Sequence, residues 1–165
     1  MSTQNDASLT LTFPSDRELL ITRTFDAPRQ LVFEAITQPA HVRNWYGPSA
    51  LTITVCEIDL RVGGKWRYVL QAPDGGEHAF SGEYLEIEAP KRLVCTEWYE
   101  AIPGAEYAAT VTLEEHDGKT TFTNHLRYKS QEHRDGHVAS GMEAGMRETY
   151  TRLDQLLAEV VLSQQ

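Results

Sequence analysis

Apolar and polar residues alternate along most of the chain, which is the pattern of half-buried β-strands. After the turn-forming glycines at 63–64, for example, Trp66, Tyr68 and Leu70 occupy every second position. The same alternation, bounded by residues that favour turns, predicts strands at residues 18–25, 51–56, 65–70, 79–87, 93–99, 108–114 and 120–128. Because most connections are short, neighbouring strands are expected to pair antiparallel.

The first 17 residues carry a weaker strand pattern. Leu9, Leu11 and Phe13 alternate with threonine, but the run stops at Pro14. We therefore predict that residues 1–17 form an arm or an edge strand. Residues 18–162 are predicted to form a single domain, which is long enough to bury a full core.

Helical spacing appears in two parts of the chain. Between the first two strands, apolar residues in 31–36 share one helical face, and Asp26 is expected to cap that helix. Thr37 is expected to cap a second short helix, which turns Val42 and Trp45 inward. Near the end, apolar residues at three- and four-residue steps predict one amphipathic helix of about five turns, preceded by a shorter helical piece near 131–138.

The element order is therefore a strand, two short helices, six strands and a long helix. An antiparallel sheet of this size needs a cover for its apolar face, and the long helix is the element able to provide it. This order predicts an α+β helix-grip fold, in which a curved antiparallel sheet of six to seven strands surrounds the C-terminal helix and leaves space between them.

Charge and composition exclude several classes of partner. The formal net charge of -9 disfavours binding to nucleic acid or to an anionic membrane surface. No apolar run reaches the ~18 residues needed to span a bilayer, and the polar residues 1–6 do not resemble a signal peptide. Cys56 and Cys95 lie in predicted strands without metal-ligand spacing, so we interpret them as buried, reduced cysteines of a cytoplasmic protein.

Five motifs together resemble one protein family. They lie at residues 23–28 (RTFDAP), 45–48 (WYGP), 59–66 (DLRVGGKW), 82–87 (GEYLEI) and 141–146 (GMEAGM). By these motifs the chain resembles the START-like superfamily, also called SRPBCC or birch-pollen-allergen-like. Within it, the chain is most similar to the family named after the activator of the ninety-kilodalton heat-shock protein ATPase. The resemblance covers residues 18–160 and implies the helix-grip fold, but it brings no shared catalytic motif.

The predicted cavity needs a mostly apolar wall with a few polar groups. Aromatic residues of the strands and the second short helix, together with Asn124 and two methionines of the long helix, have suitable positions. The candidate ligand-binding residues are Trp45, Trp66, Tyr68, Phe80, Tyr84, Trp98, Phe122, Asn124, Met142 and Met146. The alternative for each aromatic residue and methionine is that it fills the core without touching a ligand.

The polar anchor of the cavity is left open by the sequence. Strand alternation places Asn124 and His125 on opposite faces of the last strand, so one of them points inward. Arg23 is a further candidate anchor. Glu97 could act as a buried general acid, but it lies in an acidic stretch, and we interpret it as a surface carboxylate.

No metal or cofactor is expected. His133 and His137 have the four-residue spacing of helical metal ligands, yet Gly136 weakens the helix and no third ligand is evident. The chain also lacks a nucleophile elbow, a phosphate-binding loop and a dinucleotide fingerprint.

The function expected from these features is non-catalytic binding of a small, largely apolar molecule. The first alternative is an enzyme acting in the same cavity, because relatives in the superfamily include cyclases and hydrolases. The second alternative is a regulator of the chaperone ATPase. Since those co-chaperones carry an additional N-terminal domain and only 17 residues precede the first firm strand here, a chaperone partner is not expected. Association into a homodimer is left open.

Overall fold

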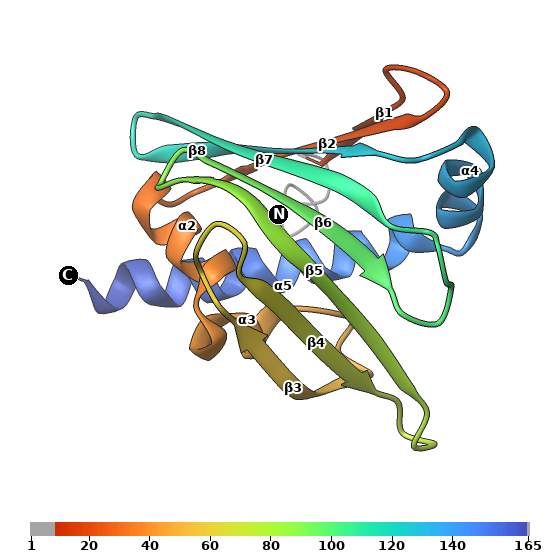
Figure 1. The fold of residues 1–165 in the computed structure, drawn as a ribbon. Coiled ribbons are helices and arrows are strands. Elements are labelled where there is room, and N and C mark those ends of the chain that lie inside the picture. The colour runs from red at the N-terminus through yellow and green to blue at the C-terminus, as the bar shows by residue number, and fades with distance from the viewer. Residues whose placement is uncertain (1–8, 165) are drawn as a thin grey trace.

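The strands predicted from the alternating pattern form one antiparallel sheet, in a computed structural model that describes residues 9–164. The sheet order is β1-β2-β8-β7-β6-β5-β4-β3 (Figure 1). Its strands are β1 (Thr10–Thr12), β2 (Glu18–Phe25), β3 (Thr52–Ile58), β4 (Lys65–Gln71), β5 (Glu77–Glu88), β6 (Arg92–Tyr99), β7 (Tyr107–His116) and β8 (Lys119–Arg127). The count is eight, above the predicted six to seven, because Thr10–Thr12 pairs with β2 at the edge of the sheet.

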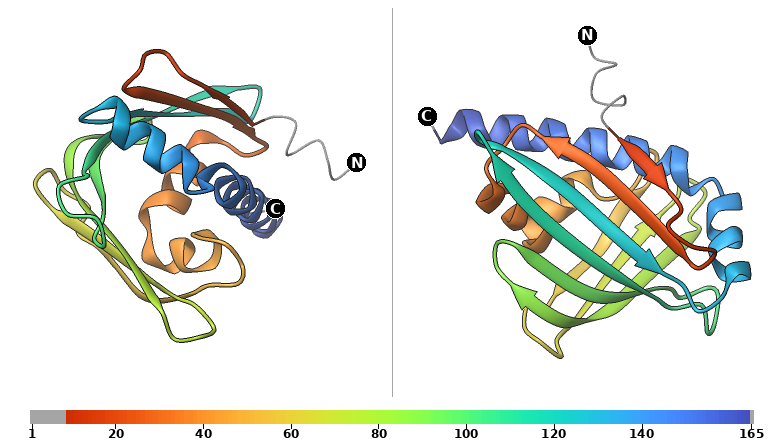
Figure 2. Two further views of the ribbon diagram at one scale, coloured as in Figure 1. Left: turned by 90° about the vertical axis from the view of Figure 1, so that its right-hand side faces the viewer. Right: turned by 90° about the horizontal axis from the view of Figure 1, so that it is seen from above.

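Four helices accompany the sheet: α2 (Arg29–Thr37), α3 (Pro39–Trp45), α4 (Gln131–Ala139) and α5 (Met142–Ser163). The two views in Figure 2 show a curved sheet with α5 running along its inner side. Helices α2 and α3 pack against α5, and α4 lies at the opposite end of the sheet (Figure 1). This arrangement is the predicted helix-grip fold.

The helix starts differ from the prediction. Asp26 does not cap α2, because the residue at the N-cap position is Pro28, which has no side-chain cap. Thr37 belongs to α2, where its hydroxyl donates a hydrogen bond to the carbonyl of Phe33 at 2.7 Å, and α3 starts after Gln38. The last helix has 22 residues, or about six turns rather than five.

The core lies where α5 and α2 meet the sheet. Leu153 and Leu157 of α5 are fully buried, together with Phe25 of β2 and Val32 of α2. The last three turns of α5 therefore close the end of the molecule at which α2 lies. Within residues 9–164, no helix combines the length and the hydropathy needed to cross a membrane.

The turn between β3 and β4 holds one wall of the interior in place. Gly63 has a φ of +84°, and a Cβ on Gly64 would lie 2.0 Å from the carbonyl oxygen of Asp59. Both positions thus require glycine. The turn exchanges two backbone hydrogen bonds with Tyr84, of 2.8 and 2.9 Å, and so fixes this β5 residue, whose side chain points inward.

Candidate functional site

A cavity of about 310 Å³ lies between the sheet and α5. Its walls come from β2 and β4–β8, from the segment 45–48 at the end of α3, and from the first half of α5. Most of the lining is apolar or aromatic. The volume falls at the lower end of the ~300–1,000 Å³ of small-molecule sites.

The structure brings nine of the ten predicted residues to this cavity. The strands turn alternate side chains inward, as with Trp66 and Tyr68 on β4, while α5 contributes its methionines one turn apart. The nine are Trp45, Trp66, Tyr68, Phe80, Tyr84, Phe122, Asn124, Met142 and Met146.

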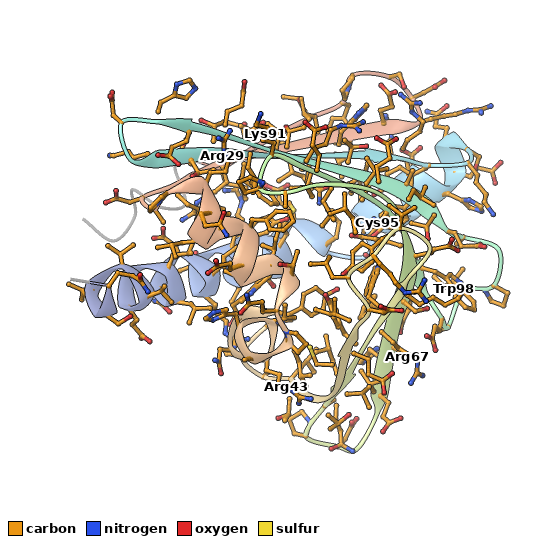
Figure 3. The ribbon with its side chains drawn as sticks, turned by 60° about the vertical axis from the view of Figure 1, so that its left-hand side comes forward. Arg29, Arg43, Arg67, Lys91, Cys95 and Trp98 are labelled. Atoms are coloured by element: carbon orange, nitrogen blue, oxygen red, sulfur yellow. The ribbon has the colours of Figure 1, made fainter. Side chains whose placement is uncertain are left out.

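Trp98 does not line the cavity, contrary to the prediction. On β6 the inward side chains are Leu93, Cys95 and Glu97, so strand alternation turns Trp98 to the outer face. Its indole N–H donates a hydrogen bond to the carbonyl of Ile102 at 2.9 Å. Figure 3 shows Trp98 and Arg67 on the side of the sheet away from α5.

Tyr46 is a wall residue that the sequence analysis missed. It follows α3 directly, and its ring lies 4.7 Å from that of Tyr68 and 6.3 Å from that of Phe80, centroid to centroid. The signal available was the WYGP motif itself, because Tyr46 sits between Trp45 and Gly47, which also line the cavity. Periodicity could not place Tyr46, since the residue lies where the helix ends.

Glu97 lines the cavity, so its interpretation as a surface carboxylate was wrong. The hydroxyl of Tyr107 donates a hydrogen bond to Oε1 of Glu97 at 2.7 Å. Burial raises the pKa of Glu97, and this hydrogen bond opposes the rise because it favours the ionised form. Glu97 and Trp98 are adjacent on β6 and therefore point to opposite faces of the sheet. Assigning the wrong face of this strand to the cavity misplaced both residues.

A second hydrogen bond lies at the same end of the cavity. The hydroxyl of Tyr128 and Nδ1 of His137 are 2.6 Å apart, and the ring of Tyr107 lies 4.8 Å from that of Tyr128 and 5.4 Å from that of His137. Burial lowers the pKa of His137, which keeps the imidazole neutral. We call Glu97, Tyr107, Tyr128 and His137 the polar cluster.

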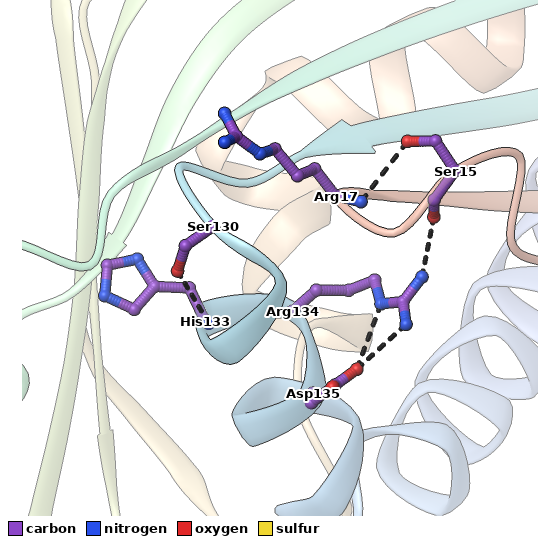
Figure 4. A network of polar contacts seen from close by, with 6 residues as sticks. All are labelled: Ser15, Arg17, Ser130, His133, Arg134 and Asp135. Atoms are coloured by element: carbon purple, nitrogen blue, oxygen red, sulfur yellow. Dashed lines mark hydrogen bonds and ion pairs between the residues drawn. The ribbon is translucent and has the colours of Figure 1, made fainter.

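Helix α4, which carries His137, is held by a network at its start (Figure 4). The Ser130 hydroxyl caps the helix by accepting a hydrogen bond from the backbone N–H of His133 at 3.1 Å. Arg134 donates to the carbonyl of Ser15 at 2.6 Å and pairs with Asp135 at 2.9 Å. The loop between β1 and β2 therefore fixes the helix that brings His137 to the cavity.

The inward face of β8 carries Asn124 rather than His125. Asn124 lines the cavity beside Tyr150 of α5, and its Oδ1 atom is buried without a hydrogen-bond partner. His125 points away, and its Nε2 lies 3.5 Å from Glu18. Arg23 is fully buried 3.7 Å from Asp154 of α5, outside the cavity lining, so it is not a wall residue.

His133 and His137, which were considered as metal ligands, lie on α4. Among residues 9–164, no group of three or more His, Cys, Asp or Glu side chains is close enough to hold an ion. Cys56 and Cys95 are both buried free thiols. Cys95 lines the cavity, and burial raises its pKa, so its thiol stays protonated and unreactive.

The sequence model of a family described as Activator of Hsp90 ATPase homolog 1-like protein matches residues 26–158. The chain belongs to this family. The resemblance found from the five motifs is thereby confirmed. A comparison with curated proteins gave no match.

Solved structures of similar proteins share the fold of this member of the Activator of Hsp90 ATPase homolog 1-like family. A protein from Rhodobacter sphaeroides is 30% identical with a TM-score of 0.87, over 92% of this chain and 99% of that one. A protein from Nitrosomonas europaea is 27% identical with a TM-score of 0.81, over 91% and 99%. One from Arthrobacter aurescens is 27% identical with a TM-score of 0.82, over 92% of each chain.

Proposed function

We propose that this protein binds a small, largely apolar molecule in the cavity between the sheet and α5, without converting it. The observation that carries the proposal is the lining of the cavity. Apolar and aromatic side chains surround about 310 Å³, and among the few polar lining groups Glu97, Tyr107 and His137 lie close together. Sites of this composition bind a ligand through its apolar body and orient it through its polar atoms.

A cavity-filling variant tests the proposal. Met146→Trp places a larger side chain on the α5 wall, so it should weaken binding of the neutral apolar dye N-phenyl-1-naphthylamine by about tenfold or more. Leu162→Trp makes the same addition at an exposed position of α5 and should leave the dye affinity unchanged. Equilibrium titration of both variants against the wild type measures the effect.

Melting temperatures separate binding from misfolding, because a destabilised protein also takes up apolar dyes through its exposed core. Phe80→Ala enlarges the cavity and should accept a bulkier dye than the wild type does. If folded Met146→Trp binds the dye as well as the wild type, and Phe80→Ala changes nothing, the cavity is not the binding site.

The polar cluster favours catalysis in the same cavity as a second candidate. A buried carboxyl group and an imidazole are groups that serve as general acid and general base. Native mass spectrometry of the freshly purified protein identifies the bound molecule, which is then incubated with fresh protein. Recovery of the unchanged molecule supports binding. A product that forms with the wild type and not with Glu97→Gln would establish an enzyme instead.

A further inference from the structure

The charge inside the cavity is unbalanced. Among the described residues that line it, Glu97 is the only acid, and none is a lysine or an arginine. Its Oε1 atom accepts the hydrogen bond from Tyr107, which leaves Oε2 for a ligand. A carboxylate in apolar surroundings is costly unless an opposite charge or hydrogen bonds stabilise it.

The titratable groups that neighbouring elements place near Glu97 are neutral. Burial raises the pKa of each tyrosine and of the one cysteine, so these groups carry no negative charge near neutral pH. Burial lowers the pKa of the imidazole, so His137 supplies no positive charge there. These groups are Tyr46 after α3, Tyr84 on β5, Cys95 on β6, Tyr107 on β7, Tyr128 after β8, His137 on α4 and Tyr150 on α5.

The direction of the one hydrogen bond favours a negative Glu97 when the cavity is occupied. Tyr107 donates to the carboxyl oxygen, and such a donor stabilises the ionised form. Aromatic rings line the same cavity, and the negative face of such a ring attracts an organic cation. The formal net charge of -9 on the whole chain also raises the local concentration of cations.

We propose that the ligand is an amphipathic amine, whose protonated nitrogen pairs with Oε2 of Glu97 while its apolar body lies against the aromatic walls. This inference rests on the proposed function, since it names the chemical class of the molecule that the cavity binds. Tyr107 orients the carboxylate, and the amine supplies the positive charge that the cavity lacks.

The pH dependence of binding follows from this pairing. A cationic amine needs Glu97 ionised, so its affinity rises as the pH increases through the pKa of Glu97, which lies above the ordinary 4.5. The affinity falls again once the amine loses its proton, near the ~10.4 of an alkylamine. A neutral ligand that accepts a hydrogen bond from protonated Glu97 would instead bind more weakly as the pH rises through the pKa of Glu97.

A matched series of ligands tests the inference: 4-phenylbutylamine, 4-phenylbutanol and 4-phenylbutanoate, which share one apolar body. By calorimetry near neutral pH, the amine should bind about ten- to a hundredfold more tightly than the alcohol, and the carboxylate most weakly. Glu97→Gln keeps an acceptor for Tyr107 and should bring the amine and the alcohol to about the same affinity.

Glu114→Gln is the matched control. It removes the same charge from an exposed position on β7 and should leave all three affinities unchanged. If the wild type binds the neutral dye but shows no preference for the amine, or if Glu97→Gln keeps that preference, the amine inference is wrong and the cavity proposal stands. If neither the dye nor any member of the series binds, both proposals fail.

Discussion

At the scale of single residues, Glu97 connects the chemistry of the cavity to the stability of the protein. Its carboxyl group lies among apolar and neutral groups, and burial raises its pKa above the ordinary 4.5. The folded protein therefore holds this proton more tightly than the unfolded chain does. The contribution of Glu97 to the free energy of unfolding is most favourable at acid pH and is lost as the pH rises from about 4.5 through the raised pKa.

Glu97→Gln should therefore stabilise the unliganded protein near neutral pH, because it removes a buried charge and keeps the acceptor for Tyr107. Below about pH 4, where the wild-type carboxyl is protonated in both states, the two proteins should have the same melting temperature. Thermal unfolding followed across this pH range measures the difference. A variant that melts below the wild type near neutral pH would show that the Glu97 charge is stabilised within the fold.

Residue positions were predictable where a strand has one clearly apolar face. Trp66 and Tyr68 illustrate this, because their polar neighbours Lys65 and Arg67 mark the opposite face. On β6 that contrast is weak: Glu97 and Trp98 are adjacent, and the glutamate is the one that faces inward. The pairing with β5 also shifts register between Tyr84 and Glu86, which no count along the sequence reveals.

At the scale of elements, the sequence predicted the order of helices and strands but not how the helices begin. Asp26 and Thr37 are residue types that often cap helices, yet Thr37 bonds back to Phe33 inside α2. The helical piece near 131–138 is present as α4, but its role depends on contacts that are distant in the sequence. Arg134 reaches Ser15, 119 positions away, which periodicity could not predict.

Arg134→Ala should loosen α4 without unfolding the protein. The change removes the hydrogen bond to Ser15 and the contact over the ring of Phe13, 5.0 Å away. Backbone amides of 131–139 should exchange with solvent faster, while those of 150–160 keep their protection. Hydrogen exchange followed by mass spectrometry measures both segments.

Gln131→Ala, at an exposed position of the same helix, is the control and should leave the exchange of α4 unchanged. Equal exchange in Arg134→Ala and the wild type would mean that the link to Ser15 does not hold α4.

At the scale of the whole molecule, the first half of α5 lines the cavity and the second half packs into the core. Met142 and Met146 face the cavity, whereas Leu153 and Leu157 are fully buried against the sheet and α2. The element order predicted that one long helix covers the sheet. The sheet is curved around this helix (Figure 2). The division of the helix into a cavity wall and a packed end became visible only in the structure.

Leu153→Ala should consequently reduce the free energy of unfolding by ~2–5 kcal/mol, through lost burial and a new void. Dye affinity should stay near that of the wild type, because Leu153 does not line the cavity. Urea unfolding and dye titration on the same samples test both statements. A loss of affinity in the folded variant would indicate that packing at this end controls the cavity.

The placement of the three tryptophans gives the protein its own optical reporter. Trp45 and Trp66 line the cavity and are 6% and 5% exposed, whereas Trp98 lies on the outer face of the sheet. A molecule that fills the cavity changes the surroundings of two indoles and leaves the third as an internal reference. Tryptophan fluorescence should therefore report whether the cavity is occupied. A water-soluble quencher reaches Trp98 before the two cavity tryptophans, so it separates the emission of Trp98 from theirs.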